Sequence, residues 1–181
     1  MHAGKVISLS VSAEHGFSKQ LCEAVTVVEG LGIEGDAHAG ETVKHRSRVR
    51  ADPTQPNLRQ VHLIHSELLE ELAASGFVVK PGDLGENILT EAVPLLDLPR
   101  HSILSIGNDV ELEVTGLRNP CQQIENFMPG LLGQVLKKRD DGTLERKSGV
   151  MTVVHRSGVI RLGDEIRITY PEGEWLPLER V

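Results

Sequence analysis

The chain has 181 residues, of which 39% are hydrophobic and 25% charged, so we expect one domain, residues 1–181, with a sizeable buried core. Its formal net charge of −7 argues against a nucleic-acid-binding protein, because such proteins usually present a basic face. Aromatic residues make up only 3% of the chain, which leaves few side chains on which nucleic-acid bases could stack.

The sequence carries no sign of export or of membrane insertion. Its first dozen residues turn polar too early for a signal peptide, and no apolar run approaches the roughly 20 residues that span a bilayer. Two cysteines, Cys22 and Cys121, do not make a disulfide scaffold. We therefore expect a cytoplasmic protein with reduced thiols and no membrane partner.

Two strands and a glycine-rich loop are predicted near the start of the chain. Lys5–Val11 shows the alternation of a strand, and Glu23–Val28 is rich in β-branched residues. The glycines that follow allow turns with positive φ. In this loop Asp36 and His38 are separated by one residue, so the carboxylate could orient the imidazole, or could stabilise the turn alone.

The segment Val43–Asn57 has no hydrophobic periodicity. It is basic at first, with Lys44, Arg46, Arg48 and Arg50, and then contains prolines. A solvated surface loop would account for most of these charges. Long segments without secondary structure are often functional in compact domains, so a lid or an anion contact near a site is the alternative.

The middle of the chain combines short strands with one clear helix. A strand over Arg59–Ile64 leads into a helix over His65–Ser75, capped by Ser66, with leucines on one face and glutamates on the other. A strand fragment is predicted over Phe77–Val79, and a glycine-bearing turn over Pro81–Glu91. A buried loop or an edge strand is predicted over Val93–Pro99.

The second half of the chain predicts hairpins and short helices. Gly107-Asn108 suits a two-residue hairpin loop between strands over Ser102–Ile106 and Asp109–Thr115. Eight or nine short strands, few helices and no regular βαβ alternation favour a mainly β fold, a closed or partly closed barrel or a sandwich. A short helix is predicted over Gly130–Arg139, and a second hairpin over Val150–Ile160 with its turn at Ser157-Gly158. A last strand is predicted over Glu165–Tyr170.

The stretch Thr115–Glu125 holds the most suggestive local chemistry. An alternating strand ends there, and Asn119 and Pro120 suit the N-cap and the first position of a helix. Cys121 would then lie in the first helical turn, where free backbone N–H groups and the nearby Arg118 favour a thiolate. Such a cysteine suits a nucleophile, a sulfur carrier or a soft-metal ligand, and a small buried hydrophobe is the equal alternative.

Other catalytic motifs are missing from the sequence. It has no HExxH or CxxC, so a structural zinc site has little support, and His62 and His65 are interpreted as surface or hydrogen-bonded residues. It has no G-x-S-x-G nucleophile elbow and no GxxxxGK[ST] phosphate loop. Cys121 with His38 as its base is conceivable, but no spacing establishes that pair.

Five motifs, in order along the chain, resemble those of the MOSC domain family, named for the C-terminal domain of molybdenum cofactor sulfurase. The last of them is interpreted as a closing hairpin. Together they run over most of the chain, whose length is similar to that of stand-alone bacterial members. The motifs are GIEGDAHAG (Gly32–Gly40), RQVHLIHSE (Arg59–Glu67), PGDLGENI (Pro81–Ile88), TGLRNPCQQI (Thr115–Ile124) and SGVIRLGDEI (Ser157–Ile166).

The resemblance implies a MOSC-like β-barrel and a role with the molybdenum cofactor, molybdopterin. Cys121 matches the family's motif cysteine, which either ligates molybdenum or is proposed to carry sulfur as a persulfide. A thiolate suits molybdenum, which prefers soft donors. The pterin phosphate needs an anion site, and the pterin ring needs hydrogen-bonding partners. The candidates for these contacts are Arg118, Asn119, Arg59, Asn87, Glu86, His38 and Asp36.

The resemblance leaves three functions open. The first is the catalytic component of a reductase that acts on small N-hydroxylated compounds. The sequence has no flavin, Fe–S or haem motif, so its electrons would come from an electron-donor protein. The second is a sulfur carrier or transferase that uses a persulfide on Cys121, and the third is a non-catalytic cofactor-binding module. Pyridoxal phosphate binding is a further association, at the level of the family only.

Overall fold

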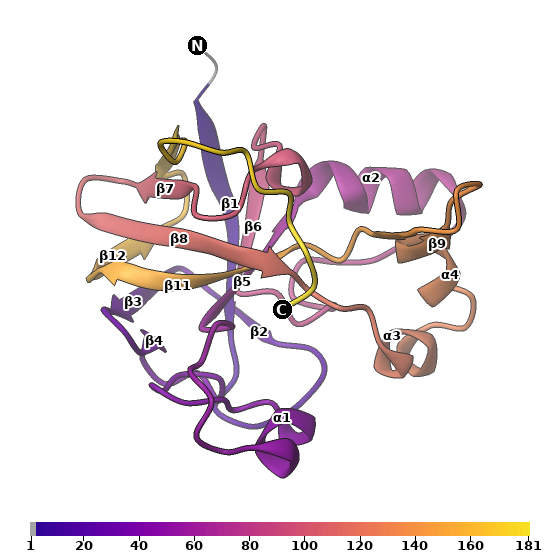
Figure 1. Cartoon of the computed structure of the whole chain (residues 1–181), viewed down its shortest axis with the longest axis horizontal. Coiled ribbons are helices and arrows are strands. Elements are labelled where there is room, and N and C mark those ends of the chain that lie inside the picture. The colour runs from indigo at the N-terminus through magenta and orange to yellow at the C-terminus, as the bar shows by residue number, and fades with distance from the viewer. Residues whose placement is uncertain (1–2) are drawn as a thin grey trace.

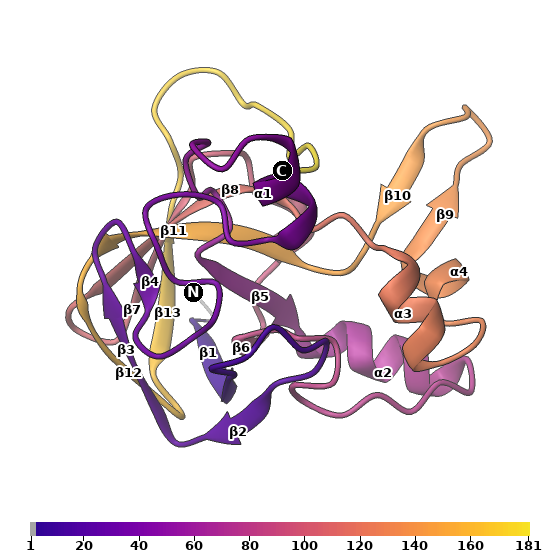
Figure 2. The same ribbon diagram turned by 90° about the horizontal axis from the view of Figure 1, so that it is seen from below.

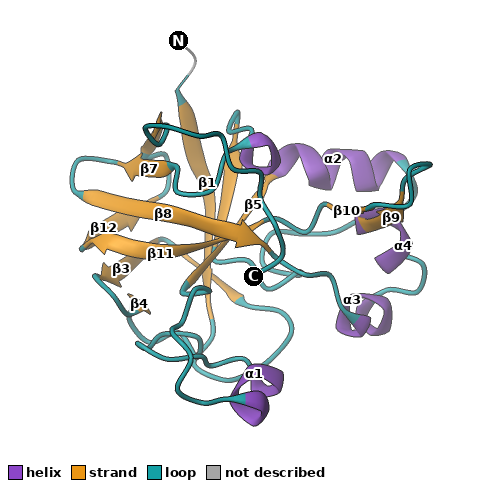
Figure 3. Ribbon diagram, in the orientation of Figure 1, coloured by secondary structure: helices purple, strands orange, loops and turns teal. Residues whose placement is uncertain are grey.

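The computed structural model describes residues 3–181 and shows a mainly β molecule with four short α-helices (Figures 1 and 3). Seven strands close into a barrel in which all neighbours are antiparallel except β5 and β6. The predicted mainly β barrel is therefore confirmed. In order around the barrel, the strands are β13 (Glu165–Thr169), β7 (Ile103–Ile106), β8 (Val110–Leu117), β11 (Val150–Arg156), β5 (Val61–His65), β6 (Ile88–Glu91) and β1 (Gly4–Val11).

The barrel closes because β1 is long enough to hold two partners along one edge. Its first residues pair with β13, with Gly4 opposite Ile166, and its last residues pair with β2 (Gln20–Cys22). The other edge of β1 carries β6, with a register shift between Val6 and Ser8. Such an irregularity increases the local twist, which helps a strand to bend around a barrel.

The barrel interior follows the alternation that the sequence shows. In β8 the side chains of Val110, Leu112 and Val114 are buried in the core, whereas those between them are half-buried. The predicted hairpin between β7 and β8 is confirmed, but Ile106 pairs with Val110, so three residues form its loop instead of two.

Two smaller sheets lie beside the barrel. β12 (Gly158–Arg161) and β4 (Gly32–Ile33) flank β3 (Ala24–Val28). β9 (Leu136–Lys138) and β10 (Leu144–Arg146) form a hairpin that projects away from the barrel strands (Figure 2).

The predicted pairing at the end of the chain is wrong. β12 does not pair with β11 or with β13, but crosses to β3, with Ile160 opposite Val25. The hairpin with its turn at Ser157-Gly158 and the closing hairpin over Ser157–Ile166 are therefore both absent. The physical reason is burial, because Ile160 and Val25 belong to the same core cluster as the barrel interior, which this small sheet covers.

Two other predicted elements differ from the structure, and a third takes one of its two predicted forms. The helix predicted over Gly130–Arg139 is reduced to α4 (Leu132–Val135), because the chain turns extended at Leu136 and enters the β9–β10 hairpin. Phe77–Val79 forms no strand. Val93–Pro99 is a buried loop that contains a single 3₁₀ turn, η1 (Leu95–Asp97).

The helices lie outside the barrel, and three of them share a second hydrophobic cluster. α2 (Ser66–Ala74) has His65, not the predicted Ser66, at its N-cap. With α3 (Gln122–Phe127) and α4 it packs against the outer face of β5 and β6 through residues such as Ile64, Leu68 and Ile124. α1 (Arg46–Ala51) buries no side chain, and it lies apart from the other helices (Figure 1). Within residues 3–181, no helix is both long and apolar enough to cross a membrane.

Candidate functional site

The outer face of the barrel sheet forms the floor of the candidate site. Met151 pairs with His62 across β11 and β5, and Asn87 is level with His62 because Leu63 pairs with Ile88. Leu63 and Ile88 point into the barrel core. Successive side chains of a strand point to opposite faces, so His62, Met151 and Asn87 point outward together.

Arg118 and Cys121 join this face from the end of β8. The backbone N–H of Arg118 donates to the carbonyl of Gly149 at 3.0 Å, which extends the pairing of β8 with the β11 segment. Ile124 is buried in the second hydrophobic cluster and holds α3 against the barrel. Burial of an isoleucine side chain contributes roughly 1.5–3 kcal/mol. This packing places Cys121 at the edge of the floor.

The predicted start of α3 is wrong by two residues. Cys121 is itself the N-cap, with φ −133° and ψ 174°, and the helix begins at Gln122. The predicted cap, Asn119, is used elsewhere, because its side-chain oxygen accepts a hydrogen bond from Arg146 Nε at 3.1 Å. The Sγ atom of Cys121 lies 3.7 Å from Gln123 Oε1.

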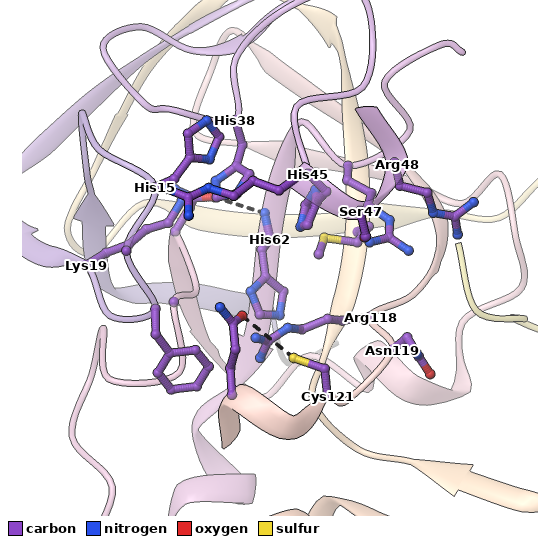
Figure 4. Close-up of a pocket in the computed structure, with 18 of the residues that line it drawn as sticks. His15, Lys19, His38, His45, Ser47, Arg48, His62, Arg118, Asn119 and Cys121 are labelled. Carbon is purple, nitrogen blue, oxygen red and sulfur yellow. Dashed lines mark hydrogen bonds between the residues drawn. The ribbon is translucent and has the colours of Figure 1, made fainter. Parts of the chain in front are cut away.

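These side chains and the loops that cover them enclose a cavity of about 530 Å³ (Figure 4). The covering loops follow β1 and β4, and the second of them includes α1. In Figure 4, Arg118 reaches towards the space between His62 and Cys121. The lining residues are His15, Gly16, Phe17, Lys19, His38, His45, Arg46, Ser47, Arg48, Arg50, Arg59, His62, Gly85, Asn87, Arg118, Asn119, Cys121, Gln123, Met151 and Arg180.

Asp36 lies behind the cavity wall and ties three segments together. Its carboxylate accepts hydrogen bonds from Lys19 Nζ at 2.7 Å, from Asn87 Nδ2 at 3.1 Å, and from the backbone N–H groups of Ser12 and His38 at 3.2 and 3.0 Å. Burial acts to raise the pKa of Asp36, but hydrogen bonds from His38 and Lys19 outweigh it and hold the pKa far below its usual range. Asp36 is therefore a carboxylate that positions Lys19 and His38 in the wall.

Asn87 is a clamp between strands. Its side-chain amide donates to the carbonyl of Ser10 and to Asp36, both at 3.1 Å, and its amide oxygen accepts from the backbone N–H of His62 at 3.1 Å. Both of its amide hydrogens are thus donated to the protein. Asn87 lines the cavity, but it has no free amide hydrogen for a ligand.

Glu86 lies outside the cavity lining. Its Oε1 atom accepts from the backbone N–H of Gly82 at 2.5 Å, and burial raises the pKa of this carboxyl. The neighbouring Gly85 has φ +81°, and a Cβ atom there would collide with the carbonyl oxygen of Phe17. Only glycine lets the two loops approach so closely at this point.

Two cavity histidines are neutral at pH 7. His62 Nε2 lies 2.8 Å from the carbonyl oxygen of Ser148, which can only accept, so Nε2 carries the proton. Burial lowers the pKa of His62 well below its ordinary value. Burial also lowers the pKa of His45 to about 3, and the neighbouring His38 and Arg59 add to the effect.

Arg118 and Arg59 are held near Cys121 in an environment that disfavours their charge. Among residues 3–181, the buried Nη1 atom of Arg118 has no hydrogen-bond partner, and its guanidinium carbon lies 5.7 Å from the ring centroid of Phe17. Burial lowers the pKa of Arg118, and burial with the charges of Arg48 and Arg118 lowers that of Arg59 to about 10. A thiolate at Cys121 acts to raise the pKa of both arginines, so its sulfur is within electrostatic reach of both guanidinium groups.

The cavity wall is strongly cationic. Its lining includes seven Lys and Arg residues but no Asp or Glu, although acidic residues outnumber basic ones by 26 to 19 in the chain. Lys19 is paired with Asp36 at 2.7 Å, whereas the six arginines make no ion pair within the described residues. The cavity is therefore suited to an anionic ligand.

Most of the predicted site residues meet at this cavity. Arg118, Asn119, Arg59, Asn87, His38 and Cys121 line it, whereas Asp36 and Glu86 are buried behind it. The sequence prediction did not include Lys19, His15, His45 or Arg180 in the site. Lys19 and Arg180 carry no local motif, and only the folded chain brings them to the cavity. The basic run that contains Arg46, Arg48 and Arg50 was the one available signal.

A family model of the MOSC domain matches residues 34–167 of this chain. The chain belongs to the MOSC domain family. The match confirms the resemblance inferred from the five motifs. The MOSC domain is associated with binding of the molybdenum cofactor. No curated protein matches the chain.

Solved structures share the fold of this MOSC domain. The YUAD protein from Bacillus subtilis is 24% identical, with a TM-score of 0.75 over 94% of this chain and 98% of that one. YiiM from Geobacillus stearothermophilus is 17% identical, with a TM-score of 0.63 over 96% of this chain and 79% of that one. YiiM from Escherichia coli is 16% identical, with a TM-score of 0.63 over 97% and 74%. At these identities the likeness shows the fold alone.

The neutral state of His45 predicts that this MOSC domain loses stability in mild acid. The pKa of His45 is about 3 in the folded chain against 6.5 ordinarily, so the unfolded chain binds more protons between these values. Stability is then complete above pH 6.5 and is lost as the pH falls towards 3. Acidification from pH 7 to pH 5 is expected to cost about 2 kcal/mol for each such histidine.

Urea unfolding at pH 7 and pH 5 measures this loss. The His45→Gln variant is expected to lose about 2 kcal/mol less than the original chain over the same interval, because glutamine does not titrate. An equal loss in both proteins would show that folding does not lower the pKa of His45.

Proposed function

We propose that the cavity binds the molybdenum cofactor, with Cys121 ligating molybdenum and with Arg59 and Arg118 binding the pterin phosphate. The observation that carries the proposal is one half-buried thiol beside the unpartnered, buried Nη1 of Arg118, in a cavity lined by arginines. A buried guanidinium N–H without an acceptor is rare, and a phosphate oxygen would satisfy it.

The donor set of the cavity fits a metal that brings most of its own ligands. Among residues 3–181, no group of three or more His, Cys, Asp or Glu side chains is arranged to hold a metal ion. A single thiolate would therefore complete the coordination of a metal held mainly by its pterin. When bound, the cofactor supplies the redox chemistry, and the chain binds it, orients it and limits access.

The proposed activity is the reduction of N-hydroxylated compounds. The N–O bond of the substrate breaks, two electrons and two protons are taken up, and the oxygen leaves as water. The electrons come from an electron-donor protein. The histidines His15, His38 and His45 line the cavity and add imidazole groups to its polar wall.

Cofactor content tests the proposal first. The chain is purified from a host that makes the molybdenum cofactor, and molybdenum per chain and fluorescence of the oxidised pterin are measured. Near-stoichiometric values support the proposal. Cyanide-labile sulfur on Cys121 without molybdenum would replace it with the sulfur-carrier function.

Turnover then separates an enzyme from a binding module. The loaded protein is incubated with an N-hydroxylated base and an artificial electron donor, and the reduced base is measured. Formation of the reduced base supports the reductase. A loaded protein without turnover would leave a cofactor-binding module and contradict the enzymatic part of the proposal.

A further inference from the structure

Hydrogen bonds and ion pairs do not fix the guanidinium of Arg118 in place. The backbone of Arg118 donates to the carbonyl of Gly149 at 3.0 Å and accepts from the hydroxyl of Ser148 at 3.3 Å. Within residues 3–181, its buried Nη1 atom has no hydrogen-bond partner, and none of the ion pairs includes Arg118. A planar head group on a long, flexible side chain therefore needs another contact to keep one orientation.

The ring of Phe17 supplies such a contact. The guanidinium carbon of Arg118 lies 5.7 Å from the ring centroid, within the distance at which the face of an aromatic ring attracts a cation. This attraction is stronger where water is excluded, and Nη1 is buried. Both residues line the cavity, so the ring supports the guanidinium at the wall where a ligand would meet it.

The ring of Phe17 is itself held by the protein. It packs against the second hydrophobic cluster, and its centroid lies 5.4 Å from that of Phe127 at the end of α3. The backbone beside it is tied to a neighbouring turn. The hydroxyl of Ser18 donates to the carbonyl of Asp83 at 2.7 Å, and the N–H of Lys19 donates to the carbonyl of Gly82 at 2.8 Å.

Two glycines of the motif PGDLGENI let the Phe17 segment lie against this turn. Gly82 has φ +86° and Gly85 has φ +81°, a backbone region that favours glycine. A Cβ atom at Gly82 would collide with the carbonyl oxygen of Lys19, and one at Gly85 would collide with that of Phe17. These two positions of the motif therefore help to place the ring that supports Arg118.

We propose that Phe17 is the positioning residue for Arg118, because its ring holds the guanidinium in place for an oxyanion such as phosphate. The anion then supplies the acceptor that Nη1 lacks within residues 3–181. A guanidinium that is already ordered loses less conformational freedom on binding, so the ring increases affinity without touching the anion. For the pterin phosphate this inference rests on the proposed function, but inorganic phosphate can test it alone.

NMR of the cofactor-free chain measures both the support and its effect. The variant Arg118→Gln assigns the Nε–H signal of Arg118 by its loss. In the original chain the ring current of Phe17 should shift this signal, and Phe17→Leu should remove the shift. Titration with inorganic phosphate then gives Kd. We expect Phe17→Leu to raise Kd at least about fivefold, because the guanidinium must be ordered during binding.

Fluorinated rings separate the attraction of the ring face from simple packing. Difluorophenylalanine and trifluorophenylalanine at position 17 withdraw negative charge from the ring face while nearly keeping its size. The Kd for phosphate should rise in the order phenylalanine, difluorophenylalanine, trifluorophenylalanine. An equal Kd across the series, or an unshifted Arg118 signal in the original chain, would overturn the proposal.

The variant Phe77→Leu is the matched control. Phe77 is also partly buried against the second hydrophobic cluster, but it lies outside the cavity lining. This variant should keep both the Arg118 shift and the Kd for phosphate. A rise in Kd as large as that of Phe17→Leu would mean that lost packing is the cause and would refute the positioning role.

The phosphate titration also keeps this inference apart from the proposed function. An Arg118 signal that does not respond to phosphate in the original chain would overturn the inference, because the ring would then position nothing for an anion. A normal response in a chain that takes up no molybdenum would contradict the proposed function and leave the role of Phe17 supported.

Discussion

A Cys121→Ser variant, purified from a host that makes the molybdenum cofactor, is expected to contain at least about tenfold less molybdenum per chain than the original protein. A serine hydroxyl is a harder donor than a thiolate and stays protonated at neutral pH. Elemental analysis of the metal, with fluorescence of the oxidised pterin, measures the loss. The pterin signal should fall less than the metal if Arg59 and Arg118 still bind the phosphate.

Cys22 supplies the matched control for this result. It lies on β2, packs against the barrel core, and is outside the cavity lining. Burial raises the pKa of the Cys22 thiol, so it stays protonated and is a poor ligand. We expect Cys22→Ala to leave the molybdenum content unchanged. Equal losses in the two variants, or full retention in Cys121→Ser, would show that Cys121 is not the ligand.

An Asp36→Asn variant is expected to lose about 3–5 kcal/mol of stability, because it leaves a buried charge without its partner. Lys19 Nζ lies 2.7 Å from the carboxylate, and the two side chains are 3% and 0% exposed. Asparagine keeps the shape of the side chain but not its charge. Urea unfolding at pH 7 measures the loss of unfolding free energy.

Two further results are expected if loss of the Lys19–Asp36 ion pair destabilises the Asp36→Asn variant. The double variant Lys19→Met/Asp36→Asn should be more stable than Asp36→Asn alone, because no unpaired charge is then buried. Burial already lowers the pKa of Lys19, and Asp36 opposes this effect. Without Asp36 the pKa falls further, so the loss should shrink as the pH rises from 7 towards 10. A loss below about 1 kcal/mol at pH 7 would contradict a buried ion pair.

Elements whose pattern is local were predicted correctly from the sequence. The alternation of Val110, Leu112 and Val114 in β8 and the turn at Gly107-Asn108 predicted the β7–β8 hairpin, because strand alternation and tight turns depend on neighbouring residues. The helix cap at Cys121 was misplaced for a tertiary reason. The side chain of Asn119 is taken by Arg146, which lies 27 residues away in the chain.

Elements whose partner is distant were not predicted. β12 follows β11 directly, and a turn at Ser157-Gly158 suits a hairpin, yet β12 pairs with β3 because Ile160 and Val25 are buried together there. Closing a longer loop costs only a little more conformational entropy than closing a short one, so burial of apolar side chains decides the pairing. The helix α1 was not predicted either, because six residues are too few to show a helical periodicity.

The sequence by itself determined the family and the barrel, and it predicted Cys121 as the functional thiol, because five short motifs and the strand alternation are local properties of the chain. Only the tertiary structure decided what surrounds Cys121. It buried Asn87 and Asp36 in hydrogen bonds between segments of the protein. It also brought Lys19, the α1 arginines and Arg180 to one cavity. The physical reason is that charge accumulates in a cavity from segments far apart in the chain. The motifs and the basic run therefore signal five of the seven cations in the wall, whereas Lys19 and Arg180 have no local pattern that places them there.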